Sequence, residues 1–289
     1  MKRLLVLASI LSVCLSIKTG HAQMVMNIVN PNESIKADSI DRVQFIAQYK
    51  LSFVTDTSKA DDITEETMML KVGSKSSSFY SYTKFVTDSA FREELKRSGG
   101  RVNRNFEKGQ NPGRISYQIF KNFPSGKVTL LDKVATSSFR CEEDNETPQW
   151  ELLPDTMTVL SYPCQKAKAH FKGRDYEAWF TTEIPRSEGP WKLHGLPGLI
   201  LKAEDTQKHY VFECSGIEQS KSEEALFFEG SDYEPISRKN LNKLYERFVK
   251  DPVGYITSTA PNVKIVVKNE SGEQIKPKDQ PYNPIEREQ

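Results

Sequence analysis

The sequence predicts a mainly β protein of the α+β class, built on one curved antiparallel sheet or half-barrel with about two helices on one side. Short stretches in which apolar and polar side chains alternate follow one another along the chain, and turn-forming residues separate them. Only two stretches have the spacing of an amphipathic helix, which argues against a doubly wound α/β fold. The 289 residues, 37% hydrophobic and 10% aromatic, suffice for one large domain or two small ones.

The first expected strand covers residues 43–53, where side chains alternate with the period of a half-buried strand. Its apolar face comprises Phe45, Ala47, Tyr49, Leu51 and Phe53. Further strands are expected over residues 68–72, 77–82, 114–120, 127–131, 158–171, 175–181, 199–203, 208–216 and 263–267. Pro163 interrupts the apolar pattern within 158–171, and a bulge or an edge position is expected there.

The first helix is expected over about 87–97, with Thr87 or Asp88 as its cap and with Phe91 and Leu95 as its apolar stripe. Residues 98–113 are rich in Gly, Arg and Asn and are expected to form a mobile loop.

The second helix is expected over about 235–250. Pro235 suits its first turn, and Asp251-Pro252 ends it.

Residues 1–22 have the pattern of a secretory signal peptide. Lys2 and Arg3 precede an apolar run from Leu4 to Val13, and a small-x-small cleavage site ends at Ala22. The run is too short to span a membrane, and no other segment approaches the necessary length. We therefore expect an exported protein, periplasmic or extracellular, without a transmembrane segment after cleavage. Lipidation of Cys14 is an alternative, although a small residue is expected before such a cysteine.

The chain beyond the signal peptide is expected to comprise a single β-rich domain at 23–268 and a tail at 269–289. Residues from Gln23 to about Lys36 are polar and are expected to be loose. The tail is rich in Pro, Lys and Glu and lacks a core pattern.

Charge and motifs narrow the possible functions. The 40 basic and 39 acidic residues form no polybasic stripe, so no nucleic-acid partner is expected. The chain contains no GxSxG, no HExxH, no phosphate-binding glycine loop and no CxxC. No catalytic residue, metal or cofactor is therefore predicted.

Three cysteines and three histidines follow the signal peptide. Cys141, Cys164 and Cys214 leave at least one thiol unpaired, and Cys141–Cys164 is the predicted pair if a disulfide forms. Cys214 and His209 fall on opposite faces of one expected strand, which favours a buried, inert thiol over a nucleophile.

The remaining ionisable candidates are expected to be solvated. His170 falls on a polar strand face beside lysines. Asp175, Glu177 and Glu183 are carboxylates that could act in acid–base catalysis, but charged side chains of this kind are usually solvated.

The stretch GPWKLHGLPGLILKAED, residues 189–205, combines three glycines, two prolines and a tryptophan with an apolar run. A type II turn over Leu196–Leu199, with Pro197 second and Gly198 third in positive φ, would lead into a buried strand. The alternative is a ligand-binding loop. The candidate binding residues are Trp179, Trp191, His194, Gly195, Leu196, Pro197, Gly198, Leu199 and Ile200.

Three segments resemble the GLPGLI family, a group of exported Bacteroidota proteins of unestablished function. They are SYPCQKAKAHFKGRDYEAWFTTEIP (161–185), GPWKLHGLPGLIL (189–201) and YNPIE (282–286). The resemblance implies an antiparallel, partly open sheet similar to lipoprotein-carrier folds, although a fold does not fix a function. It also implies that residues 282–285 dock onto the body, with Tyr282 or Ile285 in a surface groove.

These observations favour a noncatalytic envelope protein that holds an apolar ligand, a peptide or a partner protein in the concave face of its sheet. Two alternatives stay open. One is an envelope hydrolase that uses a carboxylate or His194 near the GLPGLI turn, and the other is a structural partner of an outer-membrane complex.

Overall fold

The computed structural model describes residues 21–27, 36–99, 101–106, 113–135, 137–220, 224–259, 263–268, 271–274 and 280–287. Within them the strands form one large, open sheet of 13 strands and one small sheet of three. Nearly every strand pair is antiparallel, so the predicted fold class is confirmed.

The large sheet has the strand order β15-β8-β7-β6-β4-β3-β2-β13-β12-β11-β10-β9, and β14 pairs with β2 beside this path. Its strands are β2 (Asp38–Val54), β3 (Ile63–Gly73), β4 (Ser77–Ser81), β6 (Gln118–Lys121), β7 (Lys127–Val134), β8 (Ser137–Asp144), β9 (Glu151–Val159), β10 (Tyr162–Phe171), β11 (Arg174–Thr181), β12 (Leu199–Asp205), β13 (Tyr210–Gln219), β14 (Ala225–Phe228) and β15 (Glu234–Pro235).

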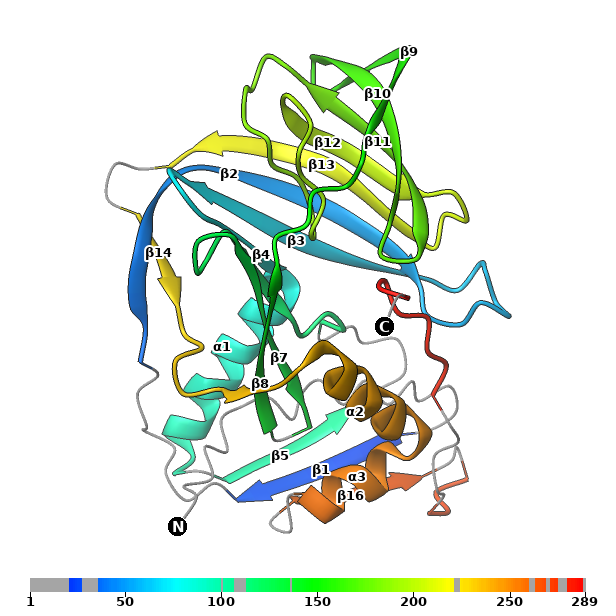
Figure 1. The fold of residues 1–289 in the computed structure, drawn as a ribbon. Helices are drawn as coiled ribbons and strands as arrows, with labels where there is room; N and C mark the ends of the chain where they lie inside the picture. The colour runs from blue at the N-terminus through cyan, green and yellow to red at the C-terminus, as the bar shows by residue number, and fades with distance from the viewer. Residues whose placement is uncertain are drawn as a thin grey trace.

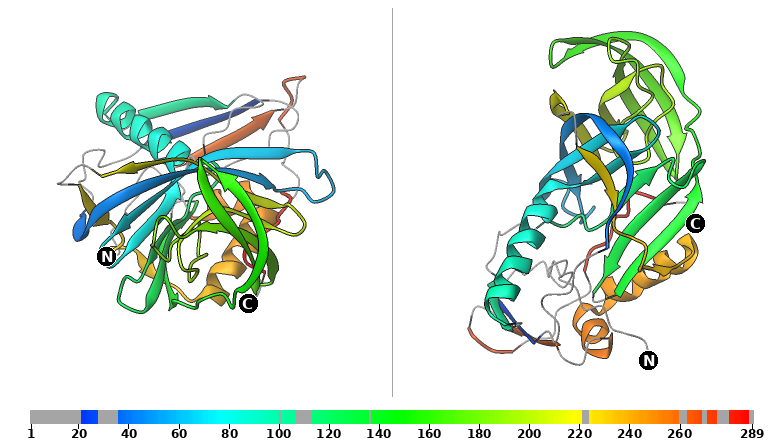
Figure 2. Two further views of the ribbon diagram at one scale, coloured as in Figure 1. Left: turned by 90° about the horizontal axis from the view of Figure 1, so that it is seen from above. Right: turned by 90° about the vertical axis from the view of Figure 1, so that its left-hand side faces the viewer.

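The sheet is strongly curved. Strands β10 to β13 lie above the long β2–β3 pair in Figure 1, whereas β7 and β8 descend below it. The helices are α1 (Tyr82–Arg97), α2 (Arg238–Lys250) and α3 (Pro252–Thr259), and both α1 and α2 lie below the β2–β3 pair (Figures 1 and 2).

The alternation predicted for β2 produces the centre of the core. Its five predicted apolar side chains are all at most 6% exposed. They lie beside the apolar faces of the two neighbouring strands, β3 and β13, as the pairs Ala47–Leu70 and Leu51–Phe212 show. The predicted strands β3, β4, β11, β12 and β13 and the β6–β7 hairpin are likewise present.

Both predicted helices begin elsewhere than expected. Helix α1 begins at Tyr82 because the Ser81 hydroxyl accepts a hydrogen bond from the Lys84 amide at 3.0 Å and caps it. Its first turn carries exposed apolar side chains, so the stripe of Phe91 and Leu95 does not mark the start.

Helix α2 is capped by Ser237, and Pro235 belongs to β15 instead. The predicted end before Asp251-Pro252 is confirmed. The unpredicted helix α3 begins at Pro252 itself, because proline is favoured at the first helical position.

Residues 158–171 form two strands joined by a tight hairpin, which corrects the prediction of one long strand. Leu160 and Ser161 both have positive φ, 48° and 71°, and reverse the chain. Sequences that favour such turns contain Asn or Gly, and neither is present here. The irregularity lies between Gln165 and Ala167, not at Pro163.

The small sheet has the strand order β16-β1-β5, with β1 at His21–Asn27, β5 at Arg101–Phe106 and β16 at Val263–Lys268. Strand β16 was predicted. The expectations of a loose segment after residue 22 and of a loop over 98–113 are wrong at β1 and β5, because these strands form by pairing between distant parts of the chain.

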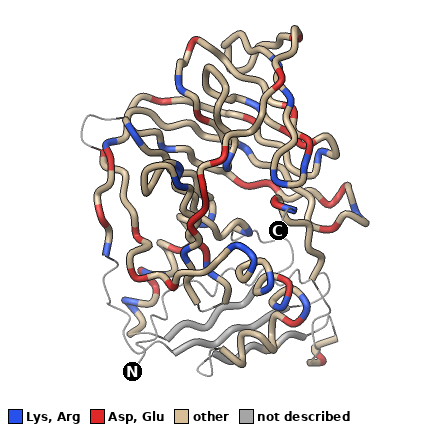
Figure 3. Tube along the Cα trace, in the orientation of Figure 1, with Lys and Arg blue, Asp and Glu red and all other residues tan. Residues whose placement is uncertain are grey.

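Residues 1–20 of the expected signal peptide lie outside the described residues, so export stays a prediction. No described helix combines the length and the apolar character needed to cross a membrane. Basic and acidic positions are interspersed along the described chain (Figure 3).

Candidate functional site

The loop between β11 and β12, residues 182–198, lies in the core of the large sheet. Trp191, Leu193 and Leu196 are at most 1% exposed and belong to the main apolar cluster. The Trp191 ring lies 5.8 Å from that of Phe171 and 5.9 Å from that of Tyr176. This loop therefore packs into the sheet instead of forming a rim around an open hollow.

Long-range hydrogen bonds fix the same loop and the start of β12, which follows it. The Tyr49 hydroxyl donates to the carbonyl of Ile200 at 2.7 Å. The Lys121 ammonium donates to the carbonyl of Gly189 at 2.7 Å and forms an ion pair with Glu188 at 2.6 Å.

Gly195 and Gly198 of the GLPGLI segment do not have the roles that the predicted type II turn would give them. Gly195 has φ of 97°, whereas Gly198 does not have positive φ, so the turn prediction is wrong at Gly198. A Cβ at Gly198 would lie 1.9 Å from the carbonyl oxygen of Thr181. Gly198 is thus required by the close approach of two backbone segments.

His194 is half-buried beside this turn. Its Nδ1 lies 2.9 Å from the carbonyl oxygen of Lys192, so Nδ1 carries the proton and donates, and Nε2 lies 3.4 Å from the Thr147 hydroxyl. Burial lowers the pKa of His194, and the charge of Lys121 lowers it further. The Thr147 contact is long for a hydrogen bond, so the pair is not an assembled nucleophile and base.

The two candidate tryptophans lie in different environments. Trp179 lies beneath the Lys166 ammonium, 5.5 Å from the ring centroid, and Lys166 forms an ion pair with Glu177 at 2.9 Å. The exposed His170 and Asp175 contact each other at 2.7 Å. These groups form salt bridges along the β10–β11 hairpin rather than a shared site with Trp191.

The three described cysteines are buried free thiols, so the predicted Cys141–Cys164 disulfide is absent. Cys141 lies on β8 and Cys164 on β10, near opposite ends of the strand order of the large sheet. Burial raises the pKa of both thiols and raises that of Cys214 to about 11.

A cavity of about 260 Å³, called here the main cavity, lies between the sheet, α2 and residues 280–286. Aromatic and aliphatic side chains form most of its wall. They are Phe53, Ile115, Tyr117, Leu130, Val134, Ala135, Trp191, Tyr210, Tyr245, Phe248, Val249, Pro281, Tyr282, Pro284 and Ile285. Of the nine candidate binding residues, Trp191 alone lines it.

The C-terminal segment 280–286 closes one side of the main cavity and is held by Arg174. The Arg174 guanidinium, 1% exposed, donates to the carbonyl of Ile285 at 2.9 Å, to the side-chain oxygen of Asn283 at 2.8 Å and to Asp205 at 2.7 Å. The Tyr210 hydroxyl donates to the carbonyl of Asn283 at 2.6 Å. Asn283 and Ile285 are buried, whereas Tyr282 is 42% exposed.

An ion-pair network connects this segment to the GLPGLI loop. Lys192 lies 2.8 Å from both Glu143 and Glu286, and Arg238 contacts the same two carboxylates. Burial alone would raise the pKa of Glu143, but the Arg238 hydrogen bonds and the Lys192 charge outweigh it and lower that pKa to about 2.

Polar groups occupy one part of the cavity wall. Asp132 is buried and accepts hydrogen bonds from the Tyr245 hydroxyl and the Lys133 amide. Burial raises the pKa of Asp132. The buried hydroxyl of Tyr117 has no hydrogen-bond partner among the described residues.

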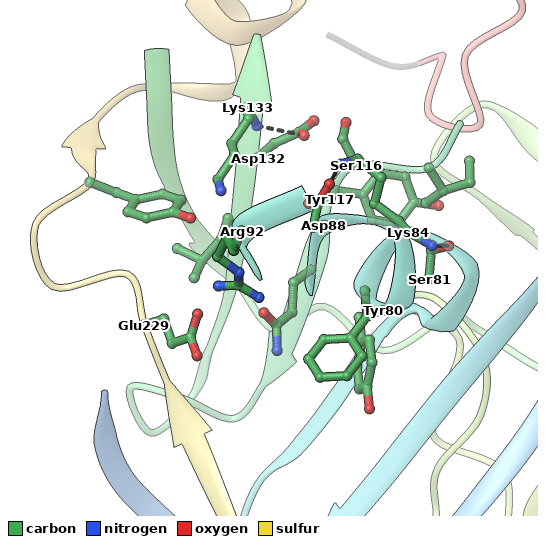
Figure 4. Close-up of a pocket in the computed structure, with 15 residues that line it drawn as sticks. Tyr80, Ser81, Lys84, Asp88, Arg92, Ser116, Tyr117, Asp132, Lys133 and Glu229 are labelled. Carbon is green, nitrogen blue, oxygen red and sulfur yellow. Dashed lines mark hydrogen bonds and ion pairs between the residues drawn. The ribbon is translucent and has the colours of Figure 1, made fainter. Parts of the chain in front are cut away.

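A second cavity of about 110 Å³ shares Ile115, Ser116, Tyr117, Asp132 and Lys133 with the main cavity. Helix α1 and the segment after β14 form its other walls. Figure 4 shows the Lys133 side chain extending toward Arg92, with Glu229 nearby.

Sequence reasoning missed most residues of both cavities. Their polar members, such as Asp132, Lys133 and Arg238, are single charged residues in ordinary strand and helix patterns, and the fold brings them together. The segment YNPIE was the sequence feature that pointed to the main cavity, because its resemblance implied docking.

Comparison with known proteins adds family information over a short stretch. Residues 170–202 match a family described as "Protein of unknown function (Porph_ging)". This stretch contains the whole GLPGLI loop, all of β11 and the first part of β12. No curated protein matches this chain.

Two crystal structures of PNGF-II, in space groups P21 and C2, are similar to this chain with a TM-score of 0.46 each. Their sequence identities are 14% and 16% over 70% of this chain. The chain spans about one third of the length of PNGF-II, 33% and 32% in the two structures.

Proposed function

We propose that this chain is an exported, noncatalytic binding protein of the GLPGLI family that holds a small apolar ring compound in the main cavity. The observation that carries the proposal is the cavity itself, about 260 Å³ with a mostly apolar wall that includes several aromatic side chains. Ligand sites in proteins are concave, mostly apolar and equipped with a few polar groups, and this cavity has those properties.

The volume suggests the size of the ligand. An engineered apolar cavity of about 150 Å³ binds benzene. The main cavity is larger, so it suits a bicyclic compound of the size of indole or naphthol. Aromatic walls favour such rings because edge-to-face and offset contacts add to the gain from burial.

The polar part of the wall supports a preferred orientation for the ligand. The unpartnered Tyr117 hydroxyl can donate to an oxygen or nitrogen atom of the ligand. A single hydroxyl or carbonyl on an otherwise apolar ring therefore fits the cavity better than a plain hydrocarbon.

The family assignment and the location rest on the sequence. The unchanged hexapeptide at residues 195–200 supports the GLPGLI family, and the Porph_ging match covers the same stretch. The apolar run at residues 4–13 after two basic residues supports export.

A binding titration with indole and 2-naphthol, followed by calorimetry, tests the proposal. Asn242→Phe on α2 fills the cavity from a partly buried position, and Lys243→Phe places the same side chain at an exposed position of the same helix. We expect Asn242→Phe to weaken binding by about tenfold or more and Lys243→Phe to leave it unchanged.

Two results would refute the proposal. One is the absence of binding of both compounds at about 1 mM, which corresponds to roughly 4 kcal/mol of binding free energy. The other is equal binding by the two variants when circular dichroism shows that both are folded.

A further inference from the structure

Lys133 on β7 is partly buried and differs from the fully buried lysines of the described chain. Lys84, Lys121 and Lys192 are 2–6% exposed, and each forms an ion pair with a carboxylate. The Lys133 ammonium makes no ion pair or hydrogen bond with any described residue, and it lies 6.0 Å from the ring centroid of Tyr233. Its side chain extends into the second cavity (Figure 4).

The charged groups around Lys133 come from three elements. Asp88 and Arg92 lie on α1, Glu229 follows β14, and Asp132 precedes Lys133 on β7. Burial lowers the pKa of Lys133 most strongly, Asp88 raises it, Arg92 lowers it, and Glu229 and Asp132 raise it by smaller amounts, so the pKa is lowered overall. Asp88 is engaged by Lys84, and Asp132 by Tyr245. A larger share of Lys133 is therefore neutral near pH 7 than of an exposed lysine.

We propose that the second cavity is a carbonyl-binding site, in which the Lys133 amine condenses reversibly with a small aldehyde. The nitrogen lone pair attacks the carbonyl carbon, and a proton moves from nitrogen to oxygen to give a carbinolamine. Loss of water then leaves a carbon–nitrogen double bond, and hydrolysis reverses the step. The reaction needs no oxidant or reductant, and neutral lysines in desolvated sites beside a second cation perform this chemistry.

The size of the cavity limits the aldehyde. At about 110 Å³ the second cavity is smaller than the roughly 150 Å³ that accommodates benzene. A short aliphatic aldehyde such as propanal therefore fits the second cavity. This inference goes beyond the ligand proposed for the main cavity, whose wall shares Lys133 and Tyr117 with the second cavity.

Reductive labelling of the full chain tests the inference. The protein is incubated with propanal and cyanoborohydride at pH 7 for short times, and the modified lysines are identified by peptide mass mapping. Lys127 is the internal reference, because it lies on the same strand, is about half exposed and has a pKa raised by its hydrogen bond to Asp144.

We expect Lys133 to be modified at least about tenfold faster than Lys127, which corresponds to one pKa unit between them. The ratio should fall as the pH rises toward 10. Labelling of Lys133 no faster than that of Lys127 at pH 7 would overturn the inference.

Two substitutions on α1 separate reactivity from mere access. Arg92→Gln removes the neighbouring cation, so it should raise the pKa of Lys133 and slow its labelling at pH 7. Arg97→Gln, at an exposed position in the last turn of the same helix, should have no effect. An unchanged pH profile of Lys133 labelling in folded Arg92→Gln protein would contradict the inference.

Discussion

Two loop segments pack against the curved sheet, and the interactions that mainly hold them differ. The GLPGLI loop, residues 182–198, is held by buried apolar side chains such as Trp191 and Leu196 and by glycines in backbone contact. The C-terminal segment, residues 280–286, is held by hydrogen bonds to its backbone from Arg174 and Tyr210. The main cavity lies beside the second segment.

This difference explains why the GLPGLI loop, the more conspicuous of the two segments in the sequence, is not the candidate binding site. Apolar packing fills space, because interiors approach the density of organic crystals. Hydrogen bonds to a backbone fix its position without requiring its side chains to fill the adjoining volume. The GLPGLI loop therefore completes the core, and the C-terminal segment leaves a cavity.

Removing the anchor of the C-terminal segment should have the largest effect. Arg174→Met deletes the bonds to that segment and leaves the buried carboxylate of Asp205, 2% exposed, without its ion-pair partner. We expect a loss of about 3–5 kcal/mol in the free energy of unfolding, measured by urea denaturation. A loss below about 1 kcal/mol would show that the segment does not depend on Arg174.

Adding one methyl group to the GLPGLI loop should have the next largest effect. Gly198→Ala forces a Cβ against the backbone of Thr181, which cannot move without shifting β11. We expect a loss of about 3 kcal/mol in unfolding free energy. Gly216→Ala is the matched control, since a Cβ there meets no heavy atom within 4 Å, and it should change stability by less than about 0.5 kcal/mol.

Acid should weaken the network that joins the two segments. The folded-state pKa of Glu143 is about 2, below the ordinary 4.5, so its contribution is present above pH 4.5 and lost as the pH falls toward 2. We expect wild-type protein to lose about 2–3 kcal/mol more than Glu143→Gln between pH 5 and pH 2.5. Parallel stability profiles of the two proteins would rule out this role for Glu143.

The smallest change in the free energy of unfolding is expected for His194, which directly precedes the GLPGLI hexapeptide. His194→Ala removes a side chain whose ring contacts one carbonyl and one distant hydroxyl, so stability should fall by about 0.5–1.5 kcal/mol. Binding of indole or 2-naphthol should not change, because His194 does not line the main cavity. A tenfold loss of affinity in this variant would assign the motif a direct role in binding.

The sequence predicted the parts of the fold that local patterns specify. The alternation around Tyr49 and Phe212 identified two central strands and their buried faces. The Leu160-Ser161 turn and the strands β1 and β5 were missed, since they depend on residues outside the usual turn types or on pairing across the chain. In the sequence, YNPIE was the one segment that pointed to the main cavity. The rest of the cavity wall combines single residues from distant segments, such as Phe53, Asp132 and Tyr245, and no local pattern marks them.

A crystal structure of the protein soaked with 6-bromo-2-naphthol tests the central claim most directly, because anomalous scattering locates the bromine atom. We predict bromine between α2 and residues 280–286, within van der Waals contact of Trp191 or Phe248. Bromine bound along residues 195–200 at the rim of the GLPGLI turn, with the main cavity free of the compound, would contradict the account.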